Sequence, residues 1–141
     1  MVSSDGGAPV NLTASFDEDA KEPAWSPGSD TLTFHSAQRV TTVLAAVPRA
    51  GGPVTPGPDR GAEAGAPVVA GDGRMAWVQS GTTTPPEVWV ADRAGLPGRK
   101  MTDLNAGIAE LALGATRAVQ WTGTDGVKIE KNTFLFYEKQ Y

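Results

Sequence analysis

The chain has no cysteine and one histidine among its 141 residues. Without cysteine it can form neither a disulfide framework nor a thiolate metal site, and a transition-metal site would have to rest on carboxylates. A serine hydrolase holds its nucleophile in a G-x-S-x-G turn, and the sequence contains no such motif. The lone histidine, His35, is interpreted as a polar residue at the end of a strand rather than as a catalytic base. We therefore predict no catalytic residues, no metal ligands, no cofactor and no enzyme activity for this chain.

Charge and hydropathy exclude two classes of partner. The 12 basic residues are outnumbered by 16 acidic ones and form no cluster, so the basic patch of a nucleic-acid binder is missing. No apolar run approaches the roughly 20 residues that span a bilayer as a helix. Residues 1–7 contain neither a basic nor an apolar stretch, so they do not resemble a signal peptide. We expect no nucleic-acid or membrane partner, and a cytoplasmic location is favoured.

Glycine and proline are abundant. The 17 glycines and 11 prolines make up about a fifth of the chain, while 40% apolar residues and four tryptophans argue against disorder. Glycine and proline both destabilise helix interiors, so long helices are disfavoured. The composition favours one all-β domain in which tight turns join many short strands.

A repeat is the most specific pattern in the sequence. Residues 23–36 (PAWSPGSDTLTFHS) and residues 67–80 (PVVAGDGRMAWVQS) both contain an apolar pair, a turn and a short alternating strand with an aromatic residue. Aligning Phe34 with Trp77 places the two copies 43 residues apart. A period of roughly 40–45 residues with about four strands is typical of a β-propeller blade. We predict antiparallel four-stranded, blade-like sheets that form about two blades of a β-propeller, with an additional C-terminal strand.

The predicted organisation has three parts. A flexible lead-in covers residues 1–10, a partial propeller covers 11–130, and an atypical tail covers 131–141. Within the propeller, blade-like units cover about 23–55 and 66–102, a linker covers 56–65, and an exit element covers about 111–130. Residues 10–13 are interpreted as the tail of a strand. The other predicted strands cover residues 23–26, 31–36, 41–47, 67–70, 74–79, 87–92 and 100–102.

The last eleven residues differ in composition from the rest of the chain. Residues 131–141 (KNTFLFYEKQY) contain no glycine, proline or alanine. Residues 134–137 have strand propensity. The tail is therefore interpreted either as a closing strand or as foreign sequence at an aberrant chain end.

Several of these segments resemble the propeller of the prolyl oligopeptidase family, in its acylaminoacyl-peptidase and dipeptidyl-aminopeptidase branch. The PAWSP stretch with its turn and the following LTFHS strand resemble the family's repeat. The triplets at 11–13 (NLT) and 100–102 (KMT) resemble its strand-ending element, and residues 87–90 (EVWV) its third strand, with Leu104 and Asn105 as the sequel. Residues 120–130 (QWTGTDGVKIE) resemble the element that leads from the propeller into the catalytic domain.

The resemblance covers about residues 10–130 and implies the last two blades of a larger propeller. The family continues after the position of Glu130 with an α/β-hydrolase domain, whereas this chain continues differently from Lys131. The resemblance therefore implies a non-catalytic fragment, which in the complete enzyme gates peptides toward a Ser-Asp-His site outside this chain. The alternative is a stand-alone protein–protein binding module that resembles the propellers of the periplasmic Tol system.

The acidic and aromatic residues have structural and functional interpretations. Residues 17–19 are interpreted as a solvated acidic loop rather than a Ca²⁺ site, because an EF-hand spreads its ligands over 12 residues. Asp92 and Glu130 remain possible acid–base groups, while Asp72, Asp103 and Asp125 are interpreted as turn residues whose side chains accept hydrogen bonds from nearby backbone N–H groups. The tryptophans are expected to fill the core between blades rather than to bind sugars or cations. They are Trp25, Trp77, Trp89 and Trp121.

Two blades alone leave apolar faces and strand edges uncovered. Repeat architectures typically need at least three stacked units for stability, and unpaired edges invite pairing with another chain. We therefore expect self-association through exposed strand edges, or marginal stability. Alternatively, the tail supplies a strand that closes a small sandwich-like domain.

Overall fold

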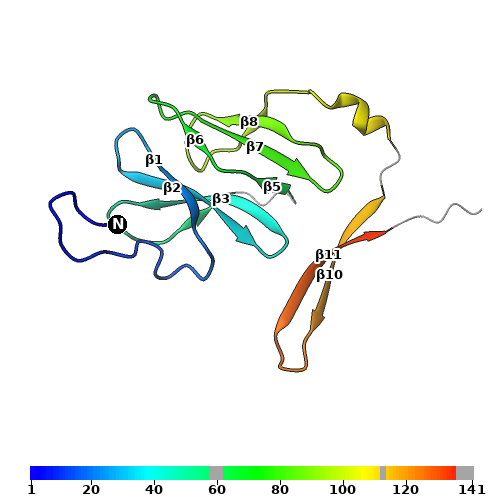
Figure 1. Cartoon of the computed structure of the whole chain (residues 1–141), viewed down its shortest axis with the longest axis horizontal. Coiled ribbons are helices and arrows are strands. Elements are labelled where there is room, and N and C mark those ends of the chain that lie inside the picture. The colour runs from blue at the N-terminus through cyan, green and yellow to red at the C-terminus, as the bar shows by residue number, and fades with distance from the viewer. Residues whose placement is uncertain (58–61, 112–113, 136–141) are drawn as a thin grey trace, which may run out of the picture.

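A computed structural model describes residues 1–57, 62–111 and 114–135, and in these residues the chain is almost entirely β-structure (Figure 1). This confirms the predicted all-β class. The strands are β1 (Lys21–Trp25), β2 (Thr31–Gln38), β3 (Thr41–Pro48), β4 (Thr55–Pro56), β5 (Ala62–Ala64), β6 (Val68–Val69), β7 (Met75–Gly81), β8 (Glu87–Ala91), β9 (Arg99–Lys100), β10 (Ala115–Thr122) and β11 (Lys128–Leu135). A short 3-10 helix, η1 (Ala106–Glu110), lies between β9 and β10.

The first four strands form an antiparallel meander, here called the first unit (residues 21–56). β1 pairs with β2, β2 with β3, and β3 with β4, so the spatial order follows the order in the sequence. The turn between β1 and β2 is closed by hydrogen bonds between Ser26 and Thr31, and its left-handed residue is Ser29, with a φ of 52°. The predicted strands of this unit are confirmed, although β1 begins two residues earlier than expected.

The second unit (residues 62–100) has the same arrangement. β5 and β6 pair with opposite ends of β7 and together act as one interrupted strand, while β7 pairs with β8 and β8 with β9. Gly73, with a φ of 89°, occupies the left-handed position in the turn before β7, which the Asp72–Gly73 pair had indicated. Each unit is therefore an antiparallel meander with strands in four positions, but the separate blade-like sheets predicted from the repeat are not shown, because both units belong to one sheet.

The two units join into one nine-stranded sheet through a single parallel pair, Thr42 of β3 with Glu63 of β5. Interpreting all of residues 56–65 as a linker was therefore wrong. Ala62–Ala64 form β5, because this segment completes the edge of β7 and also reaches β3. Residues 58–61 lie outside the described residues.

The first hydrophobic cluster lies under the first unit. Phe34 and Val47 are fully buried there, together with Ala45, and Leu12 covers them from the N-terminal segment. Phe16 meets Phe34 edge to face, with ring centroids 5.8 Å apart. Burial of a phenylalanine side chain contributes about 1.5–3 kcal/mol, so this cluster fixes both the meander and the segment before it.

The N-terminal segment differs from the prediction. Residues 10–13 form no strand, because Asn11 Oδ1 accepts hydrogen bonds from the backbone N–H and the hydroxyl of Thr13 and turns the chain. This turn carries Leu12 and Phe16 onto the first cluster. Residues 1–10 were predicted as a flexible lead-in. In the structure they form a loop in which the N–H of Val10 donates a hydrogen bond to the carbonyl of Met1, and the N-terminal ammonium of Met1 donates one to the carbonyl of Val10.

The second hydrophobic cluster lies between the two units. It contains Ala64, Met75, Trp77 and Ala91 of the second unit, and Leu44 of β3 packs against it. Trp77 therefore takes the same place in the second unit, a buried aromatic on its second row, that Phe34 takes in the first. The equivalence of these two positions agrees with the alignment made on the sequence.

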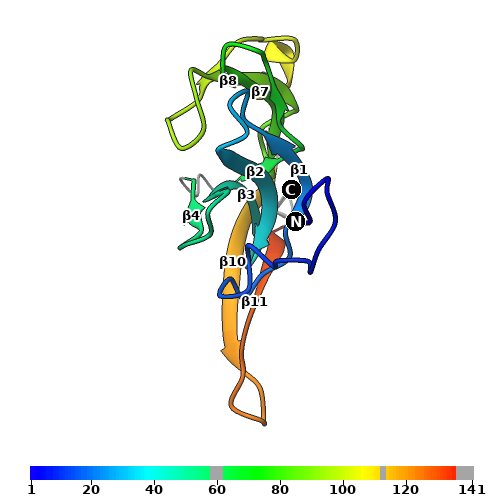
Figure 2. The same cartoon turned by 90° about the vertical axis from the view of Figure 1, so that its left-hand side faces the viewer.

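β10 and β11 form a separate two-stranded hairpin that projects from the nine-stranded sheet (Figures 1 and 2). Their register runs without a bulge through eight pairs, from Ala115 with Leu135 to Thr122 with Lys128. The change of composition at Lys131 does not interrupt the strand, and residues 136–141 lie outside the described residues. Among the described residues, one ion pair joins the hairpin to the rest: Glu130 lies 4.0 Å from Arg39, which sits at the tip of the β2–β3 turn with a φ of 57°.

Gly98 provides a test of the second cluster. A Cβ at this position would lie 2.3 Å from the indole of Trp77, so Gly98→Ala forces the buried ring to move. We expect a loss of about 1–3 kcal/mol in the free energy of unfolding, measured by urea titration of tryptophan fluorescence.

The matched control is Gly71→Ala, since a Cβ there meets nothing within 4 Å. This variant is expected to stay within about 0.5 kcal/mol of the parent chain. Equal stability of the two variants would contradict the packing of Trp77 beneath Gly98.

Candidate functional site

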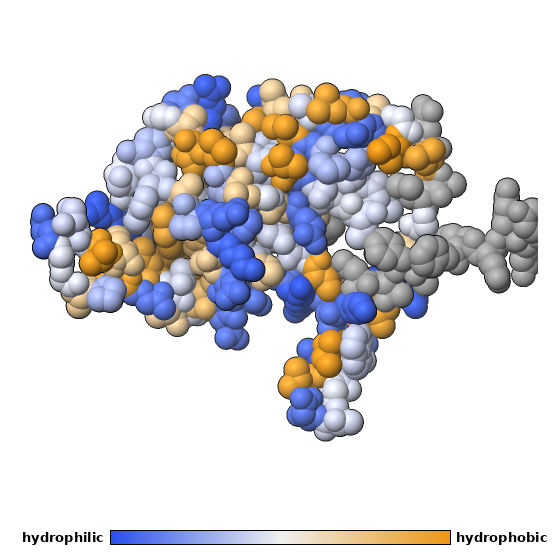
Figure 3. Space-filling model, viewed as in Figure 1, coloured by the Kyte–Doolittle hydropathy of each residue, from blue (hydrophilic) through white to orange (hydrophobic). Residues whose placement is uncertain are grey.

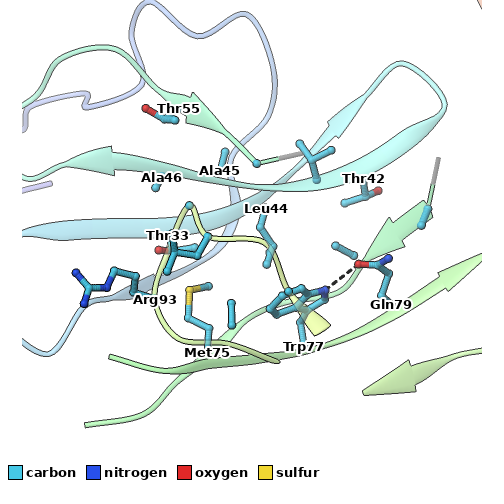
Figure 4. Close-up of a pocket in the computed structure, with 18 residues that line it drawn as sticks. Thr33, Thr42, Leu44, Ala45, Ala46, Thr55, Met75, Trp77, Gln79 and Arg93 are labelled. Atoms are coloured by element: carbon cyan, nitrogen blue, oxygen red, sulfur yellow. Dashed lines mark hydrogen bonds between the residues drawn. The ribbon is translucent and has the colours of Figure 1, made fainter. Parts of the chain in front are cut away.

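A small cavity lies between the two units (Figure 4). Leu44 of β3 points toward Met75 and Trp77 of β7, and the indole Nε1 of Trp77 donates a hydrogen bond of 3.1 Å to Gln79 Oε1. The cavity volume is about 50 Å³. Ligand pockets usually measure about 300–1,000 Å³, so this cavity is a packing gap in the second cluster rather than a binding site.

A larger cleft of about 500 Å³ with both polar and apolar walls adjoins this cavity, and Thr33, Met75 and Arg93 are among the residues that line both. Three aspartates line the cleft, each at or near a strand end: Asp30, Asp72 and Asp92. Its size is that of a ligand pocket, and its walls come from both units. The cleft is therefore the candidate functional site that the geometry favours.

Two of the cleft aspartates are already engaged within the protein. The Ser26 hydroxyl donates a hydrogen bond to Asp30 Oδ1 and holds the pKa of this carboxyl below its usual value. At Asp72, the backbone N–H of Arg74 donates to Oδ1 and its guanidinium donates to Oδ2 at 2.7 Å, and both lower the pKa of Asp72. A carboxyl with a lowered pKa is ionised at neutral pH and is a poor general acid. These two ionised groups shape the cleft and give it negative charge.

Glu87 is a buried carboxylate, with 4% of its surface exposed. Thr102 donates its hydroxyl to Glu87 Oε2, and the backbone N–H groups of Leu104 and Asn105 donate to Oε2 at 3.2 Å and Oε1 at 3.1 Å. The hydroxyl of Thr102 is the largest cause of the lowered pKa of Glu87. The carboxylate therefore fastens the segment after β9 to the start of β8, and its role is structural.

Sequence reasoning missed the role of Glu87. Alternation along β8 was the available signal, because Glu87, Trp89 and Ala91 share one face of the strand and Ala91 is a core residue. A glutamate on an interior face must find donors. The donors come from residues 15–18 positions away, and a contact over that sequence separation leaves no local pattern from which it could be predicted.

The structure revises the interpretation of His35. β2 extends to Gln38, so His35 lies within the strand rather than at its end. Its Nε2 lies 3.9 Å from Glu22 Oε2, and its Nδ1 is buried without a hydrogen-bond partner among the described residues. Ser36, the neighbouring hydroxyl, is fully buried and bonds the carbonyl of Ala37, so the two do not form a nucleophile–base pair.

The predictions for the turn aspartates and for the acidic loop agree with the structure to different degrees. Asp72 and Asp125 do accept hydrogen bonds from backbone N–H groups two residues on, as predicted. Asp103 instead pairs with the ammonium of Lys100 at 2.6 Å, so its interpretation as a turn residue was wrong. Residues 17–19 are exposed, and no group of three histidine or acidic side chains able to hold a metal occurs within the described part of the chain.

The tryptophans divide into two pairs. Trp77 belongs to the second cluster and Trp89 packs against it, which confirms the expected core role for these two. Trp25 and Trp121 are 39% and 46% exposed, so the same expectation was wrong for them. They lie on β1 and β10, which are edge strands of their sheets.

The pH dependence of stability tests the Glu87 network. A carboxyl whose folded-state pKa is lowered stabilises the fold fully above its unfolded pKa, near 4.5, and the stabilisation is lost as the pH falls through the folded value. We expect the urea midpoint of the parent chain to fall as the pH drops below about 4.5. The Glu87→Gln variant should be less stable at pH 7, and its urea midpoint should fall less over the same pH range. The exposed Glu18→Gln is the control and should follow the parent chain. Parallel curves for all three would contradict the network.

Comparisons with known proteins do not connect this site to an established activity. No protein-family model matches the chain, and no curated protein matches it either. Among the described residues, no helix is long and apolar enough to cross a membrane.

Proposed function

We propose that the chain is a non-catalytic part of a β-propeller from a prolyl-oligopeptidase-like serine peptidase, which in the complete enzyme gates peptide access to the hydrolase site. The proposal rests on the resemblance of residues 10–130 to that propeller and on the arrangement of the two units. It implies that the Ser-Asp-His site lies outside this chain.

The observation that carries the proposal is the equivalence of Phe34 and Trp77. Each is the buried aromatic on the second row of a four-rowed antiparallel meander, and the two are 43 residues apart. The first unit also packs its β3 residue Leu44 against the cluster of Trp77. A propeller is likewise built from successive four-stranded units that pack through such residues, although the two units here are also joined in one sheet by the pair of Thr42 with Glu63.

The cleft between the units supports a passage rather than a reaction centre. Asp30 and Asp72 are held ionised by their own hydrogen bonds. Nothing in the cleft combines a nucleophile with a base, as far as the described residues extend. A charged, hydrated wall of this kind suits polar peptides that move past it without being bound tightly.

A binding module is the second candidate, favoured by exposed apolar residues of the second unit and of the segment that follows it. Val68, Val78 and Met101 are 71%, 51% and 50% exposed, and Leu104 is 80% exposed. Clustered exposed apolar residues often mark protein–protein contacts. In this reading the two units are complete as they stand and act by recognising another protein.

The first test is hydrolysis of aminoacyl and acyl-peptide chromogenic substrates by the purified chain. We expect no hydrolysis above background, because no described residues form a nucleophile–base pair. Hydrolysis that survives purification and is abolished by a serine-directed inhibitor would overturn the assignment as a non-catalytic part.

The second test asks whether the units are propeller repeats. A chain in which residues 62–102 are duplicated in tandem should gain stability, since each added repeat contributes an interface with its neighbour. The control carries Trp77→Ala in the added copy alone, which removes the buried aromatic and should cancel the gain, at a cost of about 3–5 kcal/mol. An added copy that leaves the urea midpoint unchanged would contradict the propeller and favour the binding module.

A further inference from the structure

β10 has an open edge. In the described part of the chain its one neighbour is β11, so the other edge of this eight-residue strand is unpaired. A two-stranded hairpin is marginal in water without further packing. An open edge presents unpaired N–H and C=O groups that can pair with another strand.

The other free edges carry features that discourage pairing. β1 contains Pro23 and an irregularity between Lys21 and Ala24, and β4 is two residues long and includes Pro56. β9 consists of two charged residues, and β11 carries three charges. Prolines, bulges, charges and short length are the devices by which proteins protect sheet edges. β10 has eight residues, no proline and no glycine, and Arg117 is its one charge.

The alternation of backbone hydrogen bonds along the hairpin shows which N–H and C=O groups of β10 face away from β11. The N–H of Gly123 donates to the carbonyl of Val127, which sets the alternation of the antiparallel ladder. Residues 115, 117, 119 and 121 therefore bond to β11. The outward groups belong to Thr116, Ala118, Gln120 and Thr122.

The hairpin also exposes apolar side chains that lack a cover. Trp121 and Ile129 are directly paired across the strands and are 46% and 39% exposed. Figure 3 shows hydrophobic side chains along the projecting hairpin. An added strand beside β10 would widen this face and cover part of it.

We propose that two copies of the chain form a dimer by pairing β10 with β10, antiparallel about a two-fold axis. The product is a four-stranded sheet in the order β11, β10, β10 and β11 across the two copies. Its outer edges are the charged β11 strands, so the assembly stops at two copies. The inference goes beyond the proposed function and does not depend on it.

The chemistry of β10 selects one register. Placing Val119 on the two-fold axis brings all four outward residues into hydrogen-bonded rows, with Ala118 opposite Gln120 and Thr116 opposite Thr122 of the second copy. Arg117 then faces Trp121 of the second copy, where a guanidinium over an indole is favourable. No like charges meet in this register.

The experiment is sedimentation velocity of the full chain over about 1–100 µM, with amide hydrogen exchange on the same samples. We expect a monomer–dimer equilibrium with a dissociation constant of about 10–100 µM. The amides of Ala118 and Gln120 should become protected as the concentration rises. The amides of Val119 and Trp121, which already bond to β11, should change less.

Ala118→Pro removes an outward N–H that does not bond to β11. Because the two copies are related by a two-fold axis, the substitution removes two hydrogen bonds across the dimer interface. It should weaken the dimer at least about tenfold while the hairpin persists. The matched control is Lys128→Pro, which places proline on the outer edge of β11 and should leave the dimer intact.

Three results would overturn the proposal. The first is a monomer over the whole range, without concentration-dependent protection of Ala118 and Gln120. The second is assembly beyond two copies. The third is a dimer that survives Ala118→Pro but is lost with Lys128→Pro.

Discussion

β3 packs against a hydrophobic cluster on each of its faces, and the joining of the two units depends on this strand. Its residues Ala45 and Val47 lie in the first hydrophobic cluster, while Leu44 packs against the second. Strand alternation sends neighbouring side chains to opposite faces, so a single strand can serve two cores. β3 also forms the one pair that joins the two units, Thr42 with Glu63. Removing the apolar packing of Leu44 would weaken the contact between the two units at this strand.

The sequence predicted the parts of the fold whose signals are local. Alternation around Phe34 and Trp77, together with Gly73 in a tight turn, was enough to place the strands and the repeat. The errors came from contacts between distant residues. Leu12 follows a turn and reaches Phe34, and Ala62–Ala64 becomes a strand because β3 and β7 lie on either side of it.

The same limit applies to the candidate site. Asp72 was recognised as a turn residue because its partner is two positions away, whereas Glu87 was missed because its donors lie beyond β9. The cleft could not be predicted at all, since its walls come from turns of both units. In each of these carboxylates the hydrogen bonds hold the group within the fold and lower its pKa, so that it is ionised at neutral pH.

The contact between Arg39 and Glu130 determines how the hairpin responds to its surroundings. The arginine side chain is 77% exposed, whereas the side chain of Glu130 is 16% exposed, and the two charged groups are 4.0 Å apart. Salt screens charged pairs over about 10 Å at 0.1 M ionic strength, so this contact weakens as the salt concentration rises. The pairing of β10 with β11 does not depend on the contact, because the two strands are held by their own backbone ladder.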